Sequence, residues 1–247
     1  MLKEERYDKI LEILEEETYT HAQALSERLY VSMPTIRRDL SELSRRNLIV
    51  RSHGGAKKIS TEHIVTPLNF RKSQNHAEKK RISKKASELI RDGDIIFIDA
   101  STTALHMGDF LDGKSKLTVI TNGIPISIAL AERGIKTYCT GGEIQKSSLG
   151  YAGSFAQLLV KSFNYDICFF SCCALSADGK ISDTSLEENM IRSAAAQNSK
   201  KTVFLCDSSK HTLSAPYNLM DINEVDYIIS DAGEVPGLND SKKLITV

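Results

Sequence analysis

Residues 20–45 read THAQALSERLYVSMPTIRRDLSELSR, and this stretch decides the fold of the first part of the chain. Its apolar residues recur at helical spacing in two groups, Ala24, Leu25 and Leu29 and then Ile36, Leu40 and Leu43. Thr20 and Gln23 have the spacing of a capping box, which predicts that the first of two helices begins there. Tyr30-Val31 forms a tight connection, and Ser32 is a favourable N-cap for the second helix.

The second helix has a polar and basic outer face. Two short helices joined by a tight turn, the second of them basic, are typical of a helix-turn-helix, whose second helix lies in the major groove. Arginine bonds guanine edges there, and Ser or Thr contacts bases or phosphates. Asp39 is expected either to orient an arginine or to pair within the helix. The candidate DNA contacts in this region are Ser32, Thr35, Arg37, Arg38, Ser41 and Arg45.

A wing follows the second helix. The segment LIVRSHGGAKKI, residues 48–59, predicts two short strands around a Gly-Gly turn. Arg51 and Lys57 are candidate phosphate contacts on these strands. His53 either contacts DNA or forms a hydrogen bond within the turn. Helices and wing together predict a winged helix-turn-helix domain over residues 1–59.

The charge of this region is uneven, although the whole chain has 32 basic and 32 acidic residues and a formal net charge of zero. Residues 1–27 contain three basic and eight acidic side chains, whereas residues 28–58 contain eight basic and two acidic ones. A local basic face is the electrostatic signature of nucleic-acid binding. Charge alone is more typical of a solvated helix face, so the helix pattern beneath it decides the interpretation.

The residues of this domain also carry a family resemblance. The motif Val31-Ser32-x-x-Thr35-Ile36-Arg37-Arg38-Asp39-Leu40, followed by Arg51-x-His53-Gly54-Gly55-Ala56, closely resembles the DeoR-type bacterial transcriptional regulators. The arginine pair, the His-Gly-Gly-Ala wing and the spacing between them all match. The resemblance implies that the chain binds an operator in double-stranded DNA.

Composition places the chain among ordinary globular proteins, with 247 residues, 41% hydrophobic and 26% charged. Its longest apolar runs are only a few residues, too short for a membrane span, and its first residues lack the apolar core of a signal peptide. We therefore expect a cytoplasmic protein without a membrane partner. The five cysteines form no C-x-x-C pair and are interpreted as small buried hydrophobic residues. The six histidines are scattered, so neither a metal site nor a cofactor is predicted.

The rest of the chain predicts a larger α/β domain. Residues 60–70 lack periodicity and contain a proline, so we place a linker there and the second domain at residues 71–247. Apolar runs then alternate with helical patterns, which predicts βαβ units and a mostly parallel sheet covered on both faces. The expected strands are 95–99, 117–120, 136–139, 167–172, 202–207 and 227–230. The expected helices lie near 103–111, 124–133, 153–162 and 185–198, with a further basic helix within 71–91.

Small polar residues follow several of these strands. Ligands of open α/β sheets bind beyond the carboxyl ends of the strands, where hydroxyls and free amides at a helix start can hold a phosphate. Glycines at this edge allow close backbone approach, and a lysine adds positive charge. The pattern predicts a small phosphorylated, hydroxyl-rich ligand. Its candidate contacts are Asp99, Ser101, Thr102, Thr103, Asn122, Gly123, Gly141, Gly142 and Lys210.

The second domain resembles the effector-sensing domain of the DeoR-type regulators, which shares its fold with ribose-5-phosphate isomerase. The same positions match, and the acidic run Glu187-Glu188 adds Glu187 to the candidate ligand contacts. Where the family often has a glycine-containing segment, this chain has Cys172-Cys173-Ala174-Leu175, whose bulk could narrow the pocket. The resemblance implies a repressor of carbohydrate-metabolism genes that a sugar phosphate releases. Two-fold operator half-sites further imply a homo-oligomer of at least two chains.

Two other functions fit parts of the sequence. The first is a sugar-phosphate isomerase that carries a DNA-binding head, with acid–base candidates Asp99, Asp178, Asp183, Glu187, Glu188 and Lys210. Such an enzyme needs a carboxylate within reach of the sugar carbon, which sequence does not establish. The second is a binding protein whose N-terminal domain contacts only proteins, and the arginine-rich outer helix disfavours it. The regulator without enzymatic activity is the prediction.

Overall fold

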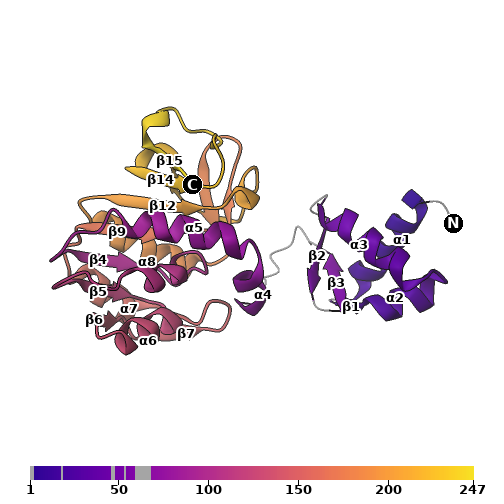
Figure 1. Cartoon of the computed structure of the whole chain (residues 1–247), viewed down its shortest axis with the longest axis horizontal. Coiled ribbons are helices and arrows are strands. Elements are labelled where there is room, and N and C mark those ends of the chain that lie inside the picture. The colour runs from indigo at the N-terminus through magenta and orange to yellow at the C-terminus, as the bar shows by residue number, and fades with distance from the viewer. Residues whose placement is uncertain (1–2, 18, 46–47, 53, 59–67) are drawn as a thin grey trace. The chain divides into compact units, whose positions relative to one another are not determined.

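The apolar stripes of the first part of the chain pack into one core. Figure 1 shows the computed structural model, which describes residues 3–17, 19–45, 48–52, 54–58 and 68–247. The chain divides into two compact units, residues 1–64 and 65–247. The helices of the first unit are α1 (Lys3–Glu16), α2 (Ala22–Leu29) and α3 (Met33–Arg45), and its strands are β1 (Thr20–His21), β2 (Ile49–Ser52) and β3 (Gly55–Lys58). Its core contains Tyr7, Ile10, Leu14, Leu25, Ile36, Leu40 and Leu43.

The wing is a three-stranded sheet in the order β1-β3-β2. β2 and β3 pair antiparallel around Gly54, as the sequence pattern predicts. The predicted capping box is wrong, because Thr20 lies in β1 and pairs with Ala56 of β3. Its hydroxyl donates to Glu17 Oε2 at 2.9 Å instead of capping α2. A Cβ at Gly55 would lie 2.3 Å from the Thr20 carbonyl oxygen, so this pairing requires glycine.

A buried ion pair joins α1 to α3. Asp39 is 1% exposed, and Arg6 of α1 binds both of its carboxylate oxygens, with Nη2 donating to Oδ1 at 2.9 Å. The hydrogen bond to Asp39 raises the pKa of Arg6. Asp39 therefore pairs with a residue of another helix, and not within its own helix.

The second unit is built on a seven-stranded parallel sheet. The strand order is β15-β14-β12-β9-β4-β5-β6, and every neighbouring pair is parallel. These strands are β4 (Ile95–Ile98), β5 (Thr118–Thr121), β6 (Lys136–Cys139), β9 (Ile167–Phe170), β12 (Thr202–Cys206), β14 (Tyr227–Ser230) and β15 (Leu244–Thr246). Six of the seven were predicted, and the mostly parallel α/β architecture is confirmed.

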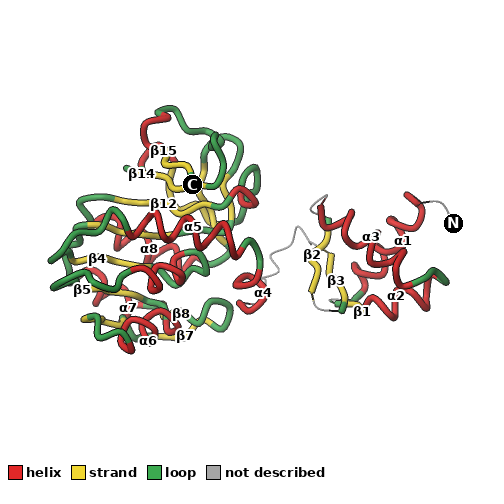
Figure 2. Tube along the Cα trace, viewed as in Figure 1, coloured by secondary structure: helices red, strands yellow, loops and turns green. Residues whose placement is uncertain are grey.

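Helices cover both faces of the sheet (Figure 2). One core cluster joins the sheet to α5 (His76–Ser87), the 3-10 helix η1 (Ala104–Phe110) and α6 (Ile124–Glu132). The other joins it to α7 (Ser154–Lys161) and α8 (Leu186–Gln197). A short helix, α4 (Leu68–Ser73), precedes α5, so the end of the stretch interpreted as a linker is helical. None of the helices in the described ranges is long and apolar enough to cross a membrane.

Strands and 3-10 turns that the sequence pattern did not predict complete the unit. They are β7 (Glu143–Gln145), β8 (Gly150–Ala152), β10 (Ala174–Leu175), β11 (Lys180–Asp183), β13 (Tyr217–Asp221) and the 3-10 turns η2 (Ser208–Lys210), η3 (Ile222–Glu224) and η4 (Ser241–Lys243). Cys168, Cys172 and Cys206 are buried as expected. Cys139 is exposed, because β6 is an edge strand.

The Arg6–Asp39 pair predicts a specific stability loss. Arg6→Met would leave the Asp39 carboxylate buried without its partner, which should lower the free energy of unfolding by about 3 kcal/mol. Urea unfolding followed by circular dichroism measures this. Arg28→Met is the control, because Arg28 pairs with Glu17 on the surface of the same unit and surface pairs contribute little. Equal losses in the two variants would contradict the structural role of Asp39.

Candidate functional site

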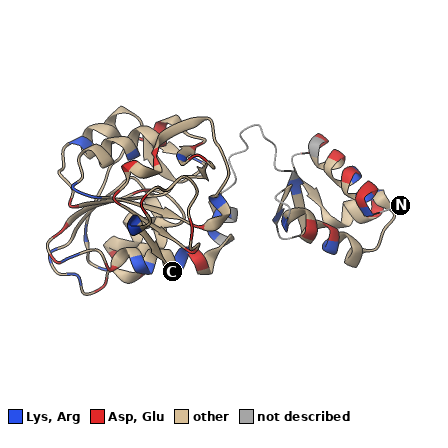
Figure 3. Cartoon of the chain, turned by 90° about the horizontal axis from the view of Figure 1, so that it is seen from above, with Lys and Arg blue, Asp and Glu red and all other residues tan. Residues whose placement is uncertain are grey.

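The outer face of α3 carries two exposed arginine side chains. Arg37 and Arg38 are exposed, and neither guanidinium bonds to another side chain within the described residues. Their direction follows from helix phase, since Ile36 and Leu40 on the same helix are buried. Figure 3 colours these charges, and acidic residues recur along the helix next to the N-terminus. The recognition helix therefore offers free hydrogen-bond donors on a support of opposite charge.

Hydrogen bonds connect the wing to this helix. Arg51 of β2 donates from Nη1 to Ser41 Oγ at 2.6 Å, and Ser41 donates to the carbonyl oxygen of Arg37 at 2.7 Å. The hydroxyls of Ser32 and Thr35 lie 2.9 Å apart at the start of α3. The first two contacts bring Arg51 and Ser41 together with Arg37, and the third pairs Ser32 with Thr35.

Two of the remaining predicted DNA contacts are restricted by an ion pair or by burial. Arg45 forms an ion pair with Glu42 at 2.8 Å on the surface of α3. Lys57 is half-buried, and desolvation lowers its pKa. His53 lies outside the described residues. The core of the candidate DNA interface is therefore Arg37 and Arg38.

In the second unit, the candidate ligand site lies at the carboxyl edge of β4. Ser101 and Thr102 line a cavity of about 10 Å³, and Gly123 forms part of its wall. A Cβ at Gly123 would lie 2.9 Å from Ile126 Cγ2, so only glycine fits there. Leu68 and Lys72 of α4 also line the cavity. A volume of this size holds about one water molecule, which is far less than a sugar phosphate needs.

Lys210 lies next to the same segment. Its ammonium donates to Ser171 Oγ at 2.7 Å and to Thr103 Oγ1 at 3.3 Å, and it pairs with Asp207 at 3.4 Å. The lysine side chain is 14% exposed, so water reaches little of it. The predicted residues Ser101, Thr102, Thr103, Gly123 and Lys210 thus come together at the carboxyl edge of the sheet.

A second buried cation, Lys79, was not predicted. It lies on α5, is 4% exposed and donates to the carbonyl oxygen of Arg71 at 2.6 Å. Burial, and then the nearby charge of Lys210, lower its pKa to about 8. Helix phase carries a signal for this residue, because Lys79 stands three positions before the buried Ile82 and seven before the buried Ala86.

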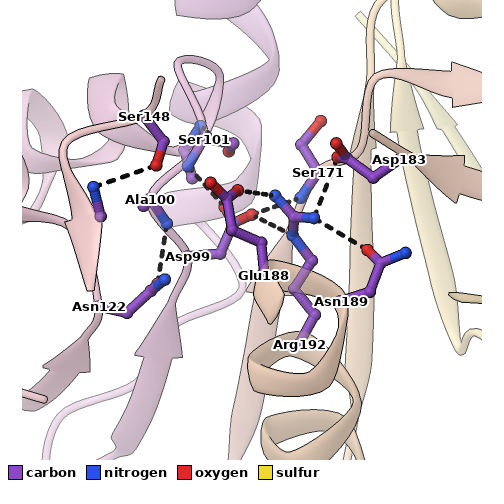
Figure 4. Close-up of polar contacts among 12 residues, drawn as sticks. Asp99, Ala100, Ser101, Asn122, Ser148, Ser171, Asp183, Glu188, Asn189 and Arg192 are labelled. Atoms are coloured by element: carbon purple, nitrogen blue, oxygen red, sulfur yellow. Dashed lines mark hydrogen bonds and ion pairs between the residues drawn. The ribbon is translucent and has the colours of Figure 1, made fainter. Parts of the chain in front are cut away.

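A buried ion cluster borders the site (Figure 4). Arg192 of α8 donates from Nε to Asp99 at 3.0 Å, from Nη1 to Asp183 at 3.0 Å and from Nη2 to Glu188 at 2.9 Å. Asp99 also accepts hydrogen bonds from the backbone amides of Ser101 and Ser171. The Asp99 carboxylate therefore forms its hydrogen bonds within the protein, and its bond to the Ser101 amide positions the 99–103 segment.

The other predicted ligand residues do not line the cavity. Asn122 bridges the Ala100 amide and the Tyr151 carbonyl oxygen, so its amide holds the backbone of the site. Gly141 and Gly142 form the turn between β6 and β7, with φ of +63° and +114°. Glu187 is exposed and accepts a hydrogen bond from Ser185. Its neighbour Glu188 faces inward because it stands four positions before Arg192 on the helix.

Most of the carboxylates that are candidates for isomerase chemistry form ion pairs or hydrogen bonds within the protein. Asp99, Asp183 and Glu188 all bind Arg192, and Asp178 accepts from Ser176 Oγ in an exposed turn. Across the described ranges, no group of three or more His, Cys, Asp or Glu side chains could hold a metal ion. Three of the candidate carboxylates are held by a single arginine in this structure.

Comparison with known proteins gives partial structural and extensive sequence matches. Ribose 5-phosphate isomerase A from Methanocaldococcus jannaschii is 15% identical, with a TM-score of 0.42 and coverage of 56% of this chain and 55% of that one. The regulator YulB of Bacillus subtilis, named as an uncharacterized HTH-type transcriptional regulator, is 32% identical over 100% of this chain and 97% of its own. The glycerol-3-phosphate regulon repressor of Escherichia coli is 30% identical over 94% of this chain and 92% of its own.

Two family models together span most of the sequence. A DeoR-like helix-turn-helix domain matches residues 6–62, and a DeoR C terminal sensor domain matches residues 74–232. The first match contains the basic face of α3. The second contains Ser101, Thr102 and Gly123 of the cavity at the end of β4, and begins after α4. The chain therefore belongs to the DeoR family of helix-turn-helix transcriptional regulators.

Proposed function

We propose that this protein is a cytoplasmic repressor of carbohydrate-metabolism genes that leaves its operator when a phosphorylated sugar binds. Residues 1–59 would hold the DNA, residues 60–70 would link the two parts, and residues 71–247 would sense the ligand. The observation that carries the proposal is a group of cations around the 101–103 hydroxyls. Lys72 lines the cavity, and Lys79 and Lys210 are nearly buried beside the single carboxylate of Asp207.

The charge balance of this group favours a phosphate. Burying an ammonium costs free energy unless an anion or several hydrogen bonds compensate it. Lys79 has one hydrogen-bond acceptor for three N–H groups within the described residues, the carbonyl oxygen of Arg71. A phosphate dianion beside Ser101, Thr102 and Lys210 would satisfy these donors. The relative named as a glycerol-3-phosphate regulon repressor supports a ligand of this class.

Ligand entry would require α4 to move. Leu68 and Lys72 of this helix close a cavity that is too small for a sugar phosphate. Arg71 donates to the carbonyl oxygen of Ser147 at 2.6 Å and accepts the hydrogen bond from Lys79, so α4 is tied to both sides of the site. α4 is also the first described element of the second unit. Its displacement would give the ligand a means to change operator affinity through a difference in binding to two states.

The DNA-binding assignment predicts a specific loss. Replacing Arg37 and Arg38 by Ala should weaken operator binding by at least about 30-fold, since each bidentate arginine–guanine contact is worth about 1–3 kcal/mol. Fluorescence anisotropy on DNA from the gene's own upstream region, at fixed salt, measures this. The control replaces Lys80 and Arg81, two exposed cations on α5, by Ala. Equal losses of operator affinity in both variants would indicate that only total charge matters, and would refute the assignment.

The ligand assignment predicts a pH dependence. Lys79 is charged below its pKa of about 8 and neutral above it, whereas a phosphomonoester remains a dianion throughout this range. Affinity for the sugar phosphate should therefore fall from about pH 7 to about pH 9. Lys79→Met should lower affinity about 10-fold or more and remove this slope, and Lys80→Met, an exposed neighbour, should do neither. Calorimetry with sugar phosphates and their unphosphorylated parents provides the test, and an unchanged affinity and slope in Lys79→Met would refute it.

A further inference from the structure

The outer faces of α7 and α8 carry large apolar side chains that nothing in the described chain covers. On α7, Phe155 is 78% exposed and Leu158 is 66% exposed. On α8, Leu186 is 46% exposed and Met190 is 45% exposed. The two helices pack side by side, with Gln157 Nε2 3.9 Å from Met190 Sδ. Single exposed apolar residues are ordinary on a protein surface, but a contiguous group marks an interaction site.

The inner faces of the same helices are apolar too. Ala156 and Val160 of α7, and Ile191 and Ala195 of α8, are buried against the sheet. A helix that covers a sheet normally turns polar residues to water on its outer side. α7 has apolar residues on both sides, which is typical of a helix that is buried on both sides. A groove of about 280 Å³ runs beside it, lined in part by Leu186, Met190 and Ser193, and could receive an apolar side chain.

The charges on this face indicate what covers it. Both helices precede strands of the parallel sheet, so α7 and α8 run in the same direction. The exposed charges of these two helices are Glu187, at the start of α8, and Lys161, at the end of α7. A two-fold axis perpendicular to the helices would place Lys161 of each copy opposite Glu187 of the other. The apolar outer face of α7 in each copy would then meet the apolar outer face of α8 in the other.

We propose that the outer face of α7 and α8 is the two-fold interface between two copies of this chain. This face is formed by Phe155, Leu158, Leu186 and Met190, with Lys161 and Glu187 at its ends. Such an interface is isologous, since one patch meets itself and the symmetry closes. The inner face of α8 binds Asp99 and Asp183 through Arg192. One helix therefore connects the interface to the ligand edge of the sheet.

Sedimentation velocity on the full chain over about 1–100 µM tests the interface. We expect the wild-type chain to form a dimer or an even multiple of it, and Phe155→Glu or Met190→Glu to halve its mass at about 10 µM. A loss of one central apolar contact on each copy corresponds to at least about a 100-fold weaker association. Ile128→Glu is the matched control, because Ile128 is 54% exposed on α6, in the opposite helix layer. It should leave the mass unchanged, and melting curves verify that all variants fold.

A charge swap tests the orientation. Lys161→Glu or Glu187→Lys alone should weaken the dimer at low salt, because like charges then face each other. The double variant should restore it. A wild-type chain that stays monomeric at about 100 µM would overturn the interface, and so would a Phe155→Glu variant with wild-type mass. A double variant weaker than both single variants would overturn the two-fold arrangement.

Discussion

The guanidinium of Arg192 is the contact on which the ligand edge of the second unit depends. It holds three carboxylates from separate parts of the chain, Asp99 after β4, Asp183 at the end of β11 and Glu188 on its own helix. A buried carboxylate without a partner would be strongly unfavourable, so all three segments must converge on this one side chain. The arrangement places the 99–103 segment where its hydroxyls face the cavity.

The carboxyl edge of the sheet carries an excess of negative charge on one side and of positive charge on the other. On one side, carboxylates outnumber the single cation Arg192, and on the other, Lys79 and Lys210 outnumber Asp207. Both groups lie at one edge because parallel strands bring all their carboxyl ends together. Ser171 connects the two groups, since its hydroxyl accepts from Lys210 and its amide donates to Asp99. A ligand with a phosphate at one end and hydroxyls along its length matches such a divided site.

The helices α4 and α8, which flank the site, make different contacts with it. α4 closes the cavity with Leu68 and Lys72 and is tied to the site through Arg71 and Lys79. α8 holds the ion cluster on its inner side and leaves Met190 exposed on its outer side. Under the proposed function and the proposed interface, a change at the ligand edge would have two short structural routes outward, one along the chain toward residues 1–64 and one toward the second copy.

The sequence by itself determined the helix-turn-helix, the outward direction of Arg37 and Arg38, and six strands of the parallel sheet. These follow from local periodicity, because the apolar stripe of a helix or strand sets which way its other residues face. The tertiary structure alone decided that Thr20 pairs in a strand, that Arg192 binds both Asp99 and Asp183, and that Lys79 lies close to Lys210. Local patterns do not record which charges meet, since these contacts join segments that are far apart in the chain and come together only when it folds.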